Sequence, residues 1–201
     1  GFAEHFAKNY DVKLDCITIS KKQLEFAKKR IFNAGLNEKV DIKFLDYRDV
    51  KGQYDSIASI EMIEAVGEKY LNKYFSMIKN NLKPHGIGAI QAIIIKDELF
   101  DQYRKNEDFI QKYIFPGGFL PSLQSIKDHT VRSGLQLTAY NSYGIHYSNT
   151  LKKWRENFIS SWNDISKQGF DQSFKKIWDF YFSYCEAGFK SKNIDLIQFS
   201  L

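Results

Sequence analysis

S-I-E-M-I-E-A-V-G, residues Ser59 to Gly67, is the stretch that decides the fold. It completes the alternating, β-branched run Asp55 to Ile60, which predicts a strand. Two carboxylates, Glu61 and Glu64, therefore lie where a strand gives way to a loop and then to a helix. In an α/β sheet, ligands bind at the carboxyl ends of the strands. Acidic residues in this position are also common in solvated loops, so a site needs support from other segments.

The neighbouring segments repeat a strand–helix order. Helices are predicted from Lys21 to about Ala34, after an N-cap at Ser20, and from Glu68 to Asn81. Further strands are predicted at Val12 to Ile19, Val40 to Leu45 and, after a Pro/Gly turn, Ile87 to Ile95. This order predicts an α/β fold built on a mostly parallel, doubly wound sheet.

The second half is richer in aromatic residues at helical spacing. A rigid turn is predicted at Ile114 to Ser122, I-F-P-G-G-F-L-P-S, with Ser122 capping the next helix. Leu135 to Tyr143 predicts a strand and Ile194 to Leu201 a closing edge strand. The other predicted helices are Asp97 to Ile114, Tyr147 to Trp162 and Asp171 to Ala187.

Composition narrows the class of protein. The 201 residues carry a net charge of +5 and 16% aromatic residues, and the positive charge is diffuse. This favours attraction to anionic surfaces, and the aromatic content favours acyl chains over nucleic acid. Cys16 and Cys185 lie far apart in the sequence, and with four histidines they predict neither a disulfide framework nor a metal site. No apolar run is long enough to span a membrane and no signal peptide is recognised, so we expect a cytoplasmic protein.

Six motifs, in this order, resemble the cyclopropane-fatty-acyl-phospholipid synthases, a branch of the class I S-adenosylmethionine-dependent methyltransferases. The resemblance covers essentially the whole chain. It implies one Rossmann-like domain over residues 1–201, with a mostly parallel sheet, an antiparallel closing strand and helical acyl-chain-binding elements at 97–133 and 147–190. The motifs are T-I-S-K-K-Q from Thr18, L-D-Y-R-D-V from Leu45, S-I-E-M-I-E-A-V-G, Y-I-F-P-G-G-F-L-P-S from Tyr113, H-Y-S-N-T-L-K-K-W from His146 and F-Y-F-S-Y-C-E-A-G-F from Phe180.

The start of the chain is also interpreted through this resemblance. Gly1 matches the last glycine of a glycine-rich cofactor loop that follows the first strand of the family's sheet. We therefore expect the sequence to lack that strand, which would lie between Val12 to Ile19 and Asp55 to Ile60. Unpaired strand edges are costly, so we expect the isolated 201 residues to be unstable or inactive.

The resemblance implies S-adenosylmethionine as the cofactor. It assigns Thr18, Ile19 and Gln23 to the ribose and amino-acid moieties. Leu45, Asp46 and Tyr47 surround the adenine, with Asp46 accepting from its exocyclic amine; Gly1 and Glu61 complete the set. From the residues alone, Ser20 with Gln23 can equally form a helix cap, and Asp46 a turn.

The implied reaction adds a methylene group to the cis double bond of an unsaturated phospholipid acyl chain and forms a cyclopropane. In the family a bicarbonate ion takes the proton lost before ring closure, and the resemblance assigns Glu64, Gln91 and Tyr147 to hold it. Two positions depart from the common pattern. Many members have histidine at the two positions that are Ala65 and Gln91 in this chain. The side chain of Gln91 cannot titrate.

Aromatic side chains are the candidates for lining the acyl chain: Tyr113, Phe115, Trp154 and Tyr184. An ordinary aromatic core is the alternative interpretation. Lys152, Lys153 and Arg155 are candidates for contacts to lipid phosphates. We expect a peripheral protein at the inner membrane surface and leave the oligomeric state open, a homodimer included. The alternative functions are a lipid carbon methyltransferase without ring closure and an inactive lipid-binding fragment.

Overall fold

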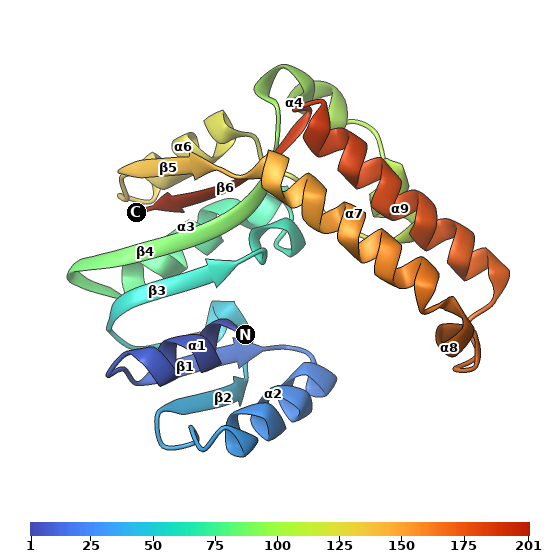
Figure 1. The fold of residues 1–201 in the computed structure, drawn as a ribbon. Coiled ribbons are helices and arrows are strands. Elements are labelled where there is room, and N and C mark those ends of the chain that lie inside the picture. Colours follow the sequence, from blue (N-terminus) through green and yellow to red (C-terminus); the bar gives the residue numbers. More distant parts are fainter. The chain divides into compact units, whose positions relative to one another are not determined.

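The computed structural model describes residues 1–201 as a mixed α/β chain (Figure 1). Its contacts divide it into two compact units, Gly1–Gly52 and Gln53–Leu201. Each unit is described by itself. The prediction of a single methyltransferase domain stays a prediction.

The first unit is a two-stranded parallel sheet with helices packed against it. Strand pairing runs from Leu14 opposite Val40 to Thr18 opposite Phe44. A small core of Ala7, Ile31, Val40 and Ile42 holds the helices on the strands. The elements are α1 (Phe2–Asn9), β1 (Leu14–Thr18), α2 (Lys21–Asn33), β2 (Val40–Phe44) and the 3-10 helix η1 (Tyr47–Asp49).

The second unit contains a four-stranded mixed sheet in the order β3-β4-β6-β5. β3 and β4 are parallel, and β6 is antiparallel to both of its neighbours. Its strands are β3 (Tyr54–Ile60), β4 (Leu82–Ile95), β5 (Ala139–Ser142) and β6 (Ile194–Ser200). Its helices are η2 (Ile63–Ala65), η3 (Glu68–Tyr70), α3 (Leu71–Asn81), α4 (Asp97–Tyr103), α5 (Phe109–Tyr113), α6 (Leu123–Arg132), α7 (Gly144–Ser160), α8 (Trp162–Ser166) and α9 (Gln172–Lys190).

Two layers of helices pack on this sheet. α3 and α6 contact each other and cover one face of the sheet, with Tyr74, Phe75 and Ile126 fully buried (Figure 1). The long helices α7 and α9 pack side by side and extend away from the sheet (Figure 1). Their shared core with β6 consists of Leu151, Phe182, Phe189 and Leu196.

The sequence predicts one mostly parallel sheet, and this is confirmed only in part. The parallel pairs β1–β2 and β3–β4 are both present, but they belong to two sheets. β1 pairs only with β2, and β3 pairs only with β4. The further strand expected between them stays a prediction.

The prediction that residues 194–201 form an edge strand is wrong. β6 lies between β4 and β5, and β5 is the edge strand. The physical reason is burial, because β6 carries buried Leu196, Ile197 and Phe199, whereas all four residues of β5 are exposed. A strand that is hydrogen-bonded to a neighbour on each edge lies inside the sheet and buries apolar side chains that an edge strand need not bury.

The start of β4 also differs from the prediction. The strand begins at Leu82 rather than at Ile87, and it runs through the predicted Pro/Gly turn. A register shift opposite Tyr54 and Ser56 absorbs the extra residues. Gly86 suits this bulge, because a Cβ there would lie only 3.0 Å from the carbonyl oxygen of Lys83 and the backbone would have to shift.

α7 begins at Gly144, three residues before the predicted start at Tyr147. The Gly144 amide donates to Asp195 Oδ1 at 2.8 Å, so a β6 carboxylate caps the helix. A Cβ on residue 144 would collide with this carboxylate and lie 3.2 Å from the ring of Phe189. A side chain at this position would therefore force the Asp195 carboxylate or the helix start to shift.

Candidate active site

Glu61 lies at the carboxyl end of β3, directly beyond the paired residues Ile60 and Gln91. Its amide donates to the Gln91 carbonyl oxygen at 2.9 Å. Its φ of +49° is in the left-handed region, which is uncommon for residues other than glycine. In this conformation Gln91 Nε2 donates to Glu61 Oε1 at 2.7 Å.

Tyr147 on α7 supplies the second hydrogen bond to the same carboxylate. Its hydroxyl donates to Glu61 Oε2 at 3.0 Å. The ring packs against Trp154 and Phe189, with centroids 6.0 and 5.0 Å away. Burial, followed by the negative charge of Glu61, raises the pKa of Tyr147 above its ordinary value, so the phenol stays a neutral donor.

Gln198 on β6 extends this network across the sheet. It pairs directly with Gln91 in the antiparallel register, and its Nε2 donates to Gln91 Oε1 at 2.8 Å. The oxygen of the Gln91 amide is thus occupied, and its nitrogen is directed to Glu61. Four side chains, from two strands, the residue after a third strand and a helix, form one chain of hydrogen bonds, which we call the Glu61 cluster: Glu61, Gln91, Tyr147 and Gln198.

Glu64 lies on η2 and has a different environment. Its Oε1 accepts from the Ile93 amide at 2.6 Å, where β4 continues beyond the end of β3. Its Oε2 is buried and has no hydrogen-bond partner. Burial raises the pKa of Glu64 to about 7. Near neutral pH this carboxyl group is protonated about half of the time.

These contacts differ from the predicted grouping. The sequence places Glu64 with Gln91 and Tyr147, and Glu61 with the cofactor. In the structure, Gln91 and Tyr147 both bond to Glu61, and Glu64 bonds to the β4 backbone. Sequence reasoning missed Gln198, because its proximity to Gln91 depends on a strand register that no local pattern reveals. The chemical roles of all these residues stay predictions.

The predicted lining residues lie in three aromatic contacts of the second unit. Tyr113 on α5 and Tyr184 on α9 both contact Phe109, which also packs edge-on against Phe180. Phe115 contacts Tyr181 at 6.0 Å, and Trp154 contacts Tyr147. All four predicted residues are exposed, between 43% and 54%. They are not ordinary core residues, but their contact with an acyl chain stays a prediction.

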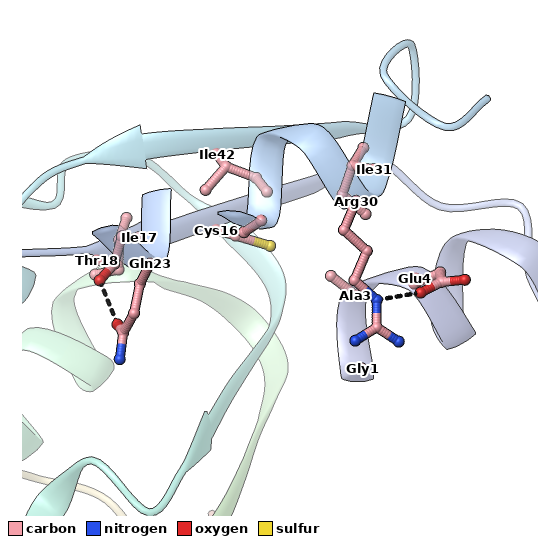
Figure 2. Close-up of a pocket in the computed structure, with 11 residues that line it drawn as sticks. Gly1, Ala3, Glu4, Cys16, Ile17, Thr18, Gln23, Arg30, Ile31 and Ile42 are labelled. Carbon is pink, nitrogen blue, oxygen red and sulfur yellow. Dashed lines mark hydrogen bonds and ion pairs between the residues drawn. The ribbon is translucent and has the colours of Figure 1, made fainter. Parts of the chain in front are cut away.

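A cavity in the first unit brings together some of the predicted cofactor residues. It measures about 230 Å³, and Gly1, Thr18 and Gln23 are among its lining residues (Figure 2). The Thr18 hydroxyl donates to Gln23 Oε1 at 2.8 Å. The remaining lining includes apolar residues and the Cys16 thiol, whose pKa is raised first by burial. A hydroxyl and an amide beside apolar walls suit a ligand with ribose hydroxyls.

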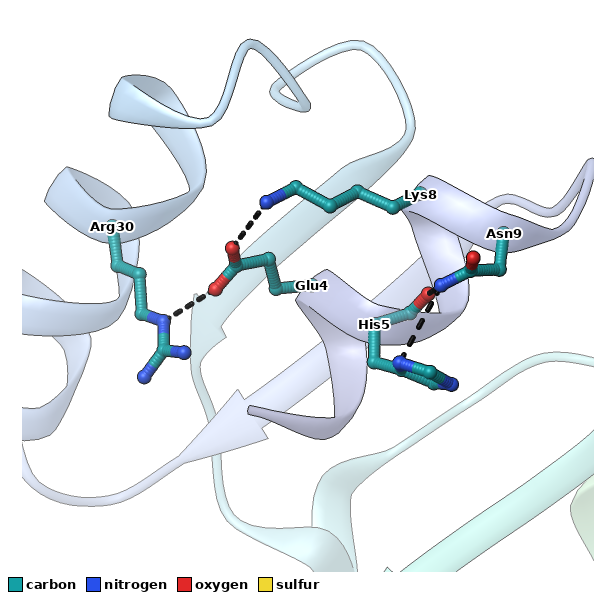
Figure 3. Close-up of polar contacts among 5 residues, drawn as sticks. All are labelled: Glu4, His5, Lys8, Asn9 and Arg30. Atoms are coloured by element: carbon teal, nitrogen blue, oxygen red, sulfur yellow. Dashed lines mark hydrogen bonds and ion pairs between the residues drawn. The ribbon is translucent and has the colours of Figure 1, made fainter.

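Two members of an ion-pair cluster, Glu4 and Arg30, line this cavity. Glu4 accepts from both Lys8 and Arg30, each at 2.6 Å (Figure 3). These hydrogen bonds, that of Lys8 being the stronger influence, lower the pKa of Glu4 to about 2. The ion pair between Arg30 and Glu4 connects α2 to α1 beside the cavity.

The other predicted cofactor residues do not line this cavity. Ile19 is 69% exposed, and Leu45, Asp46 and Tyr47 follow β2. Asp46 caps η1 by accepting from the Arg48 amide and also binds the Arg48 guanidinium. Ser20 likewise caps α2 by accepting from the Gln23 amide. The capping interpretation is confirmed, and the cofactor assignments stay predictions.

The basic cluster beside Trp154 is partly engaged within the helices. Arg155 pairs with Asp179 of α9 at 2.6 Å, and Lys153 lies 3.6 Å from Glu156. None of the helices combines the length and the hydropathy that crossing a bilayer requires.

Comparison with known proteins gives three consistent findings. The family described as mycolic acid cyclopropane synthetase matches residues 1–199. The chain is 42% identical over 186 residues to tuberculostearic acid methyltransferase of Mycobacterium tuberculosis, covering 92% of this chain and 44% of that protein. It is 34% identical over 198 residues to cyclopropane-fatty-acyl-phospholipid synthase of Escherichia coli K12, covering 98% and 49%. The chain spans about half the length of the curated relatives it matches.

Solved structures show the same fold. The crystal structure of a mycolic acid cyclopropane synthase complexed with SAH and CTAB aligns with a TM-score of 0.87 and 24% identity, covering 96% of this chain and 71% of that one. A cyclopropane synthase from Mycobacterium tuberculosis aligns with a TM-score of 0.85 and 23% identity, covering 96% and 70%. At these identities the likeness establishes the fold alone.

Proposed function

This chain belongs to the mycolic acid cyclopropane synthetase family, and from that premise we propose that its complete protein transfers a one-carbon unit from S-adenosylmethionine to the cis double bond of an unsaturated phospholipid acyl chain. The product predicted from the sequence is a cyclopropane fatty acid. We propose that the reaction takes place at the inner membrane surface, where the protein binds peripherally from the cytoplasm.

The Glu61 cluster is the observation that carries this proposal. Both oxygens of the Glu61 carboxylate are hydrogen-bonded, one of them to Tyr147. The ring of Tyr147 in turn contacts the rings of Trp154 and Phe189. A reaction that passes through a carbocation needs aromatic faces beside the positive charge and a group that takes a proton. This combination supports one-carbon transfer to a double bond over simple lipid binding.

S-adenosylmethionine, when bound, supplies an electrophilic methyl group to the double bond. We propose that Gly1, Thr18 and Gln23 contact it in the cavity of the first unit, and that Ile19, Leu45, Asp46 and Tyr47 contact its adenosine. The Thr18 hydroxyl and the Gln23 amide are suited to bond its polar groups. The pKa of Cys16 is raised by burial, so its thiol stays protonated and does not compete as a nucleophile.

The residues of the second unit act on the acyl chain in this proposal. Tyr113, Phe115, Trp154 and Tyr184 present exposed aromatic surface that an acyl chain would cover. Tyr147 and Gln91 orient the carboxylate of Glu61. Glu64 holds the end of β4 through Ile93 and, when protonated, adds no second negative charge beside Glu61.

A second candidate function is methyl transfer to the lipid without ring closure. It is favoured by the higher identity to a fatty-acid methyltransferase, 42%, than to a cyclopropane synthase, 34%. Both candidates share the methyl-transfer step and differ in the bond that forms when the cation afterwards loses a proton.

The experiment incubates the complete gene product with vesicles of unsaturated phospholipid and labelled S-adenosylmethionine. Ring-proton signals in the NMR spectrum of the extracted lipid would support cyclopropane formation, and a labelled methyl or methylene branch would support the second candidate. Product mass does not discriminate, because a cyclopropane and a methylated alkene contain the same atoms. Absence of cofactor binding by the folded protein would contradict both and favour an inactive lipid-binding protein.

A further inference from the structure

The side chains of the Glu61 cluster do not fit a bicarbonate ion. Tyr147 has a single donor, and it is bonded to Glu61 Oε2. The Gln91 amide donates to Glu61 Oε1 and is held in that orientation by Gln198. Of the three residues assigned to the ion from the sequence, only Glu64 keeps an unpartnered oxygen. Two of the three expected contacts are therefore already made to a carboxylate of the protein.

The negative charge of the Glu61 carboxylate also argues against a bound bicarbonate ion. A carboxylate and a bicarbonate ion have the same planar arrangement of two oxygen atoms and the same negative charge. Two such anions within contact distance repel each other strongly in a partly buried site. The cluster has one set of donors, and Glu61 already uses it.

We propose that the carboxylate of Glu61 takes the place of bicarbonate in this protein and is itself the group that accepts the substrate proton. This inference rests on the proposed function. It makes Glu61 a catalytic residue, and Tyr147, Gln91 and Gln198 become positioning residues that hold its two oxygens.

The proton-transfer step balances without another reactant. After methyl transfer the acyl chain carries a positive charge on the carbon beside the new C–CH3 bond. A C–H bond of that methyl group breaks, and its electron pair forms the third C–C bond of the ring. The proton goes to a Glu61 oxygen, so the cation and the carboxylate are neutralised together. Without ring closure, the proton leaves a neighbouring chain carbon and its electron pair forms a C=C bond beside the methyl branch. For a methylene branch, a hydride first shifts to the cationic carbon, and the proton then leaves the new methyl group.

Two substitutions at Glu61 separate this role from a structural one. Glu61→Gly removes the carboxylate and opens its place, and it relieves the backbone because glycine adopts a φ of +49° readily. Glu61→Gln keeps the side-chain volume but has neither the charge nor the basicity, so the place stays filled. Tyr147 and Gln91 keep their donor groups in both variants.

The first readout does not depend on activity. Binding of ¹³C-labelled bicarbonate to the complete protein is followed by line broadening in ¹³C NMR. We expect the wild-type and Glu61→Gln proteins to bind it at least about tenfold more weakly than Glu61→Gly, which corresponds to about 1.4 kcal/mol. Equal binding by wild type and Glu61→Gly, or no binding by either, would overturn the inference.

The second readout is methyl transfer in buffer depleted of carbon dioxide. Wild-type turnover should not change when bicarbonate is added. Both variants should lose activity by about 100-fold or more, as for loss of a general base. Added bicarbonate should restore activity to Glu61→Gly and not to Glu61→Gln.

The outcomes distinguish the two proposals. A wild-type enzyme that transfers methyl groups only when bicarbonate is present would sink the inference and leave the proposed function standing. A wild-type protein that transfers none would sink the proposed function, and the binding measurement would still decide whether Glu61 fills the anion's place.

Discussion

At the scale of single residues, the two glutamates of one motif differ in environment although they are three positions apart. Glu61 receives two side-chain donors, whereas Glu64 receives one backbone donor and has a buried oxygen without a partner. A buried carboxyl with few donors holds its proton more strongly than a solvated one. The motif therefore supplies one carboxyl group that is held by two side-chain donors and one that is neutral for part of the time near neutral pH.

The raised pKa of Glu64 should make the free energy of unfolding depend on pH. Its pKa is raised from 4.5 to about 7 in the folded protein, so the folded state binds the proton more tightly than the unfolded chain. The stabilisation is complete below about pH 4.5 and is lost as the pH rises through about 7. The difference amounts to about 3 kcal/mol between pH 4.5 and 8.

Urea unfolding of wild type and Glu64→Gln across this pH range tests that prediction. The free energy of unfolding of wild type should fall with increasing pH, and that of Glu64→Gln should fall by about 3 kcal/mol less. Glu107→Gln, in the exposed loop between α4 and α5, is the matched control. An unchanged pH slope in Glu64→Gln would show that Glu64 is not the responsible group.

Tyr147→Phe removes one of the two hydrogen bonds to Glu61 and leaves the ring contacts in place. A hydrogen bond to a charged group contributes about 1.5 to 3 kcal/mol, so kcat/KM for methyl transfer should fall about 10- to 100-fold. Cofactor affinity, measured by calorimetry, should not change. Tyr143→Phe, a tyrosine just before α7, is the control, and an equal loss there would contradict a specific role for Tyr147.

The sequence was enough to select most residues of this candidate site, but not to predict which of them contact each other. Glu61, Glu64, Gln91 and Tyr147 were all recognisable from motif order. Their pairing depends on the backbone at Glu61, where a positive φ at a non-glycine residue has no sequence signal. Gln198 was not recognisable because it reaches Gln91 only through the β4–β6 register.

At the scale of elements, the start of α7 determines where Tyr147 lies. Gly144 packs against Asp195 and Phe189 without room for a Cβ. Gly144→Ala should shift the first turn of α7 and lower stability by about 1 to 3 kcal/mol, the usual cost of overpacking. Because Tyr147 lies one turn further along, methyl transfer should fall as well.

Thermal unfolding and kinetics of Gly144→Ala measure both effects. Ile145→Ala is the matched control. Ile145 lies in the same turn of α7 as Gly144, but its side chain is 58% exposed. A Gly144→Ala protein as stable and active as this control would show that β6 does not fix the helix start.

Most elements were predictable from local patterns, and the misassigned ones show where such patterns fail. α2 and α6 begin after their predicted caps, Ser20 and Ser122. The position of β6 inside its sheet was not predictable, because alternation in I-D-L-I-Q-F-S describes a strand and not its neighbours. The cap of α7 by Asp195 joins residues 51 positions apart, which also lies beyond local pattern.

At the scale of the whole molecule, a net charge of +5 predicts attraction to anionic lipid. Binding to vesicles rich in phosphatidylglycerol should exceed binding to phosphatidylcholine vesicles and should weaken as salt is added. The double reversal Lys152→Glu/Lys153→Glu, beside exposed Trp154, should weaken binding by at least about tenfold, since each basic residue near the surface contributes about 1 kcal/mol.

The double reversal Lys28→Glu/Lys29→Glu on α2 is the charge-matched control for this vesicle experiment. It changes the net charge equally but lies in the first unit. Equal weakening by the two double variants, measured by sedimentation, would show that the attraction comes from overall charge and not from the helix surface around Trp154.

The architecture was predictable as α/β from the alternation of strands and helices. The unpaired edges of β1 and β3 were expected from the family resemblance, which places a further strand between them, and not from the alternation. Alternation predicts which segments are strands and that consecutive ones are parallel. Continuity of a sheet depends on every strand having a partner on each side, which the order of segments does not reveal. β1 and β3 each have one partner here.

The place of β6 between β4 and β5 has a consequence for how the protein is made. The ribosome completes β4 at residue 95, but the strand that covers its free edge begins only at residue 194. At about 5 to 20 residues per second, the intervening stretch of about 100 residues takes roughly 5 to 20 seconds to emerge. During that interval the nascent chain presents an unpaired edge beside Ala92 and Ile94 to any other chain translated nearby. This edge therefore stays open to such pairing until β6 has been synthesised and has paired with β4.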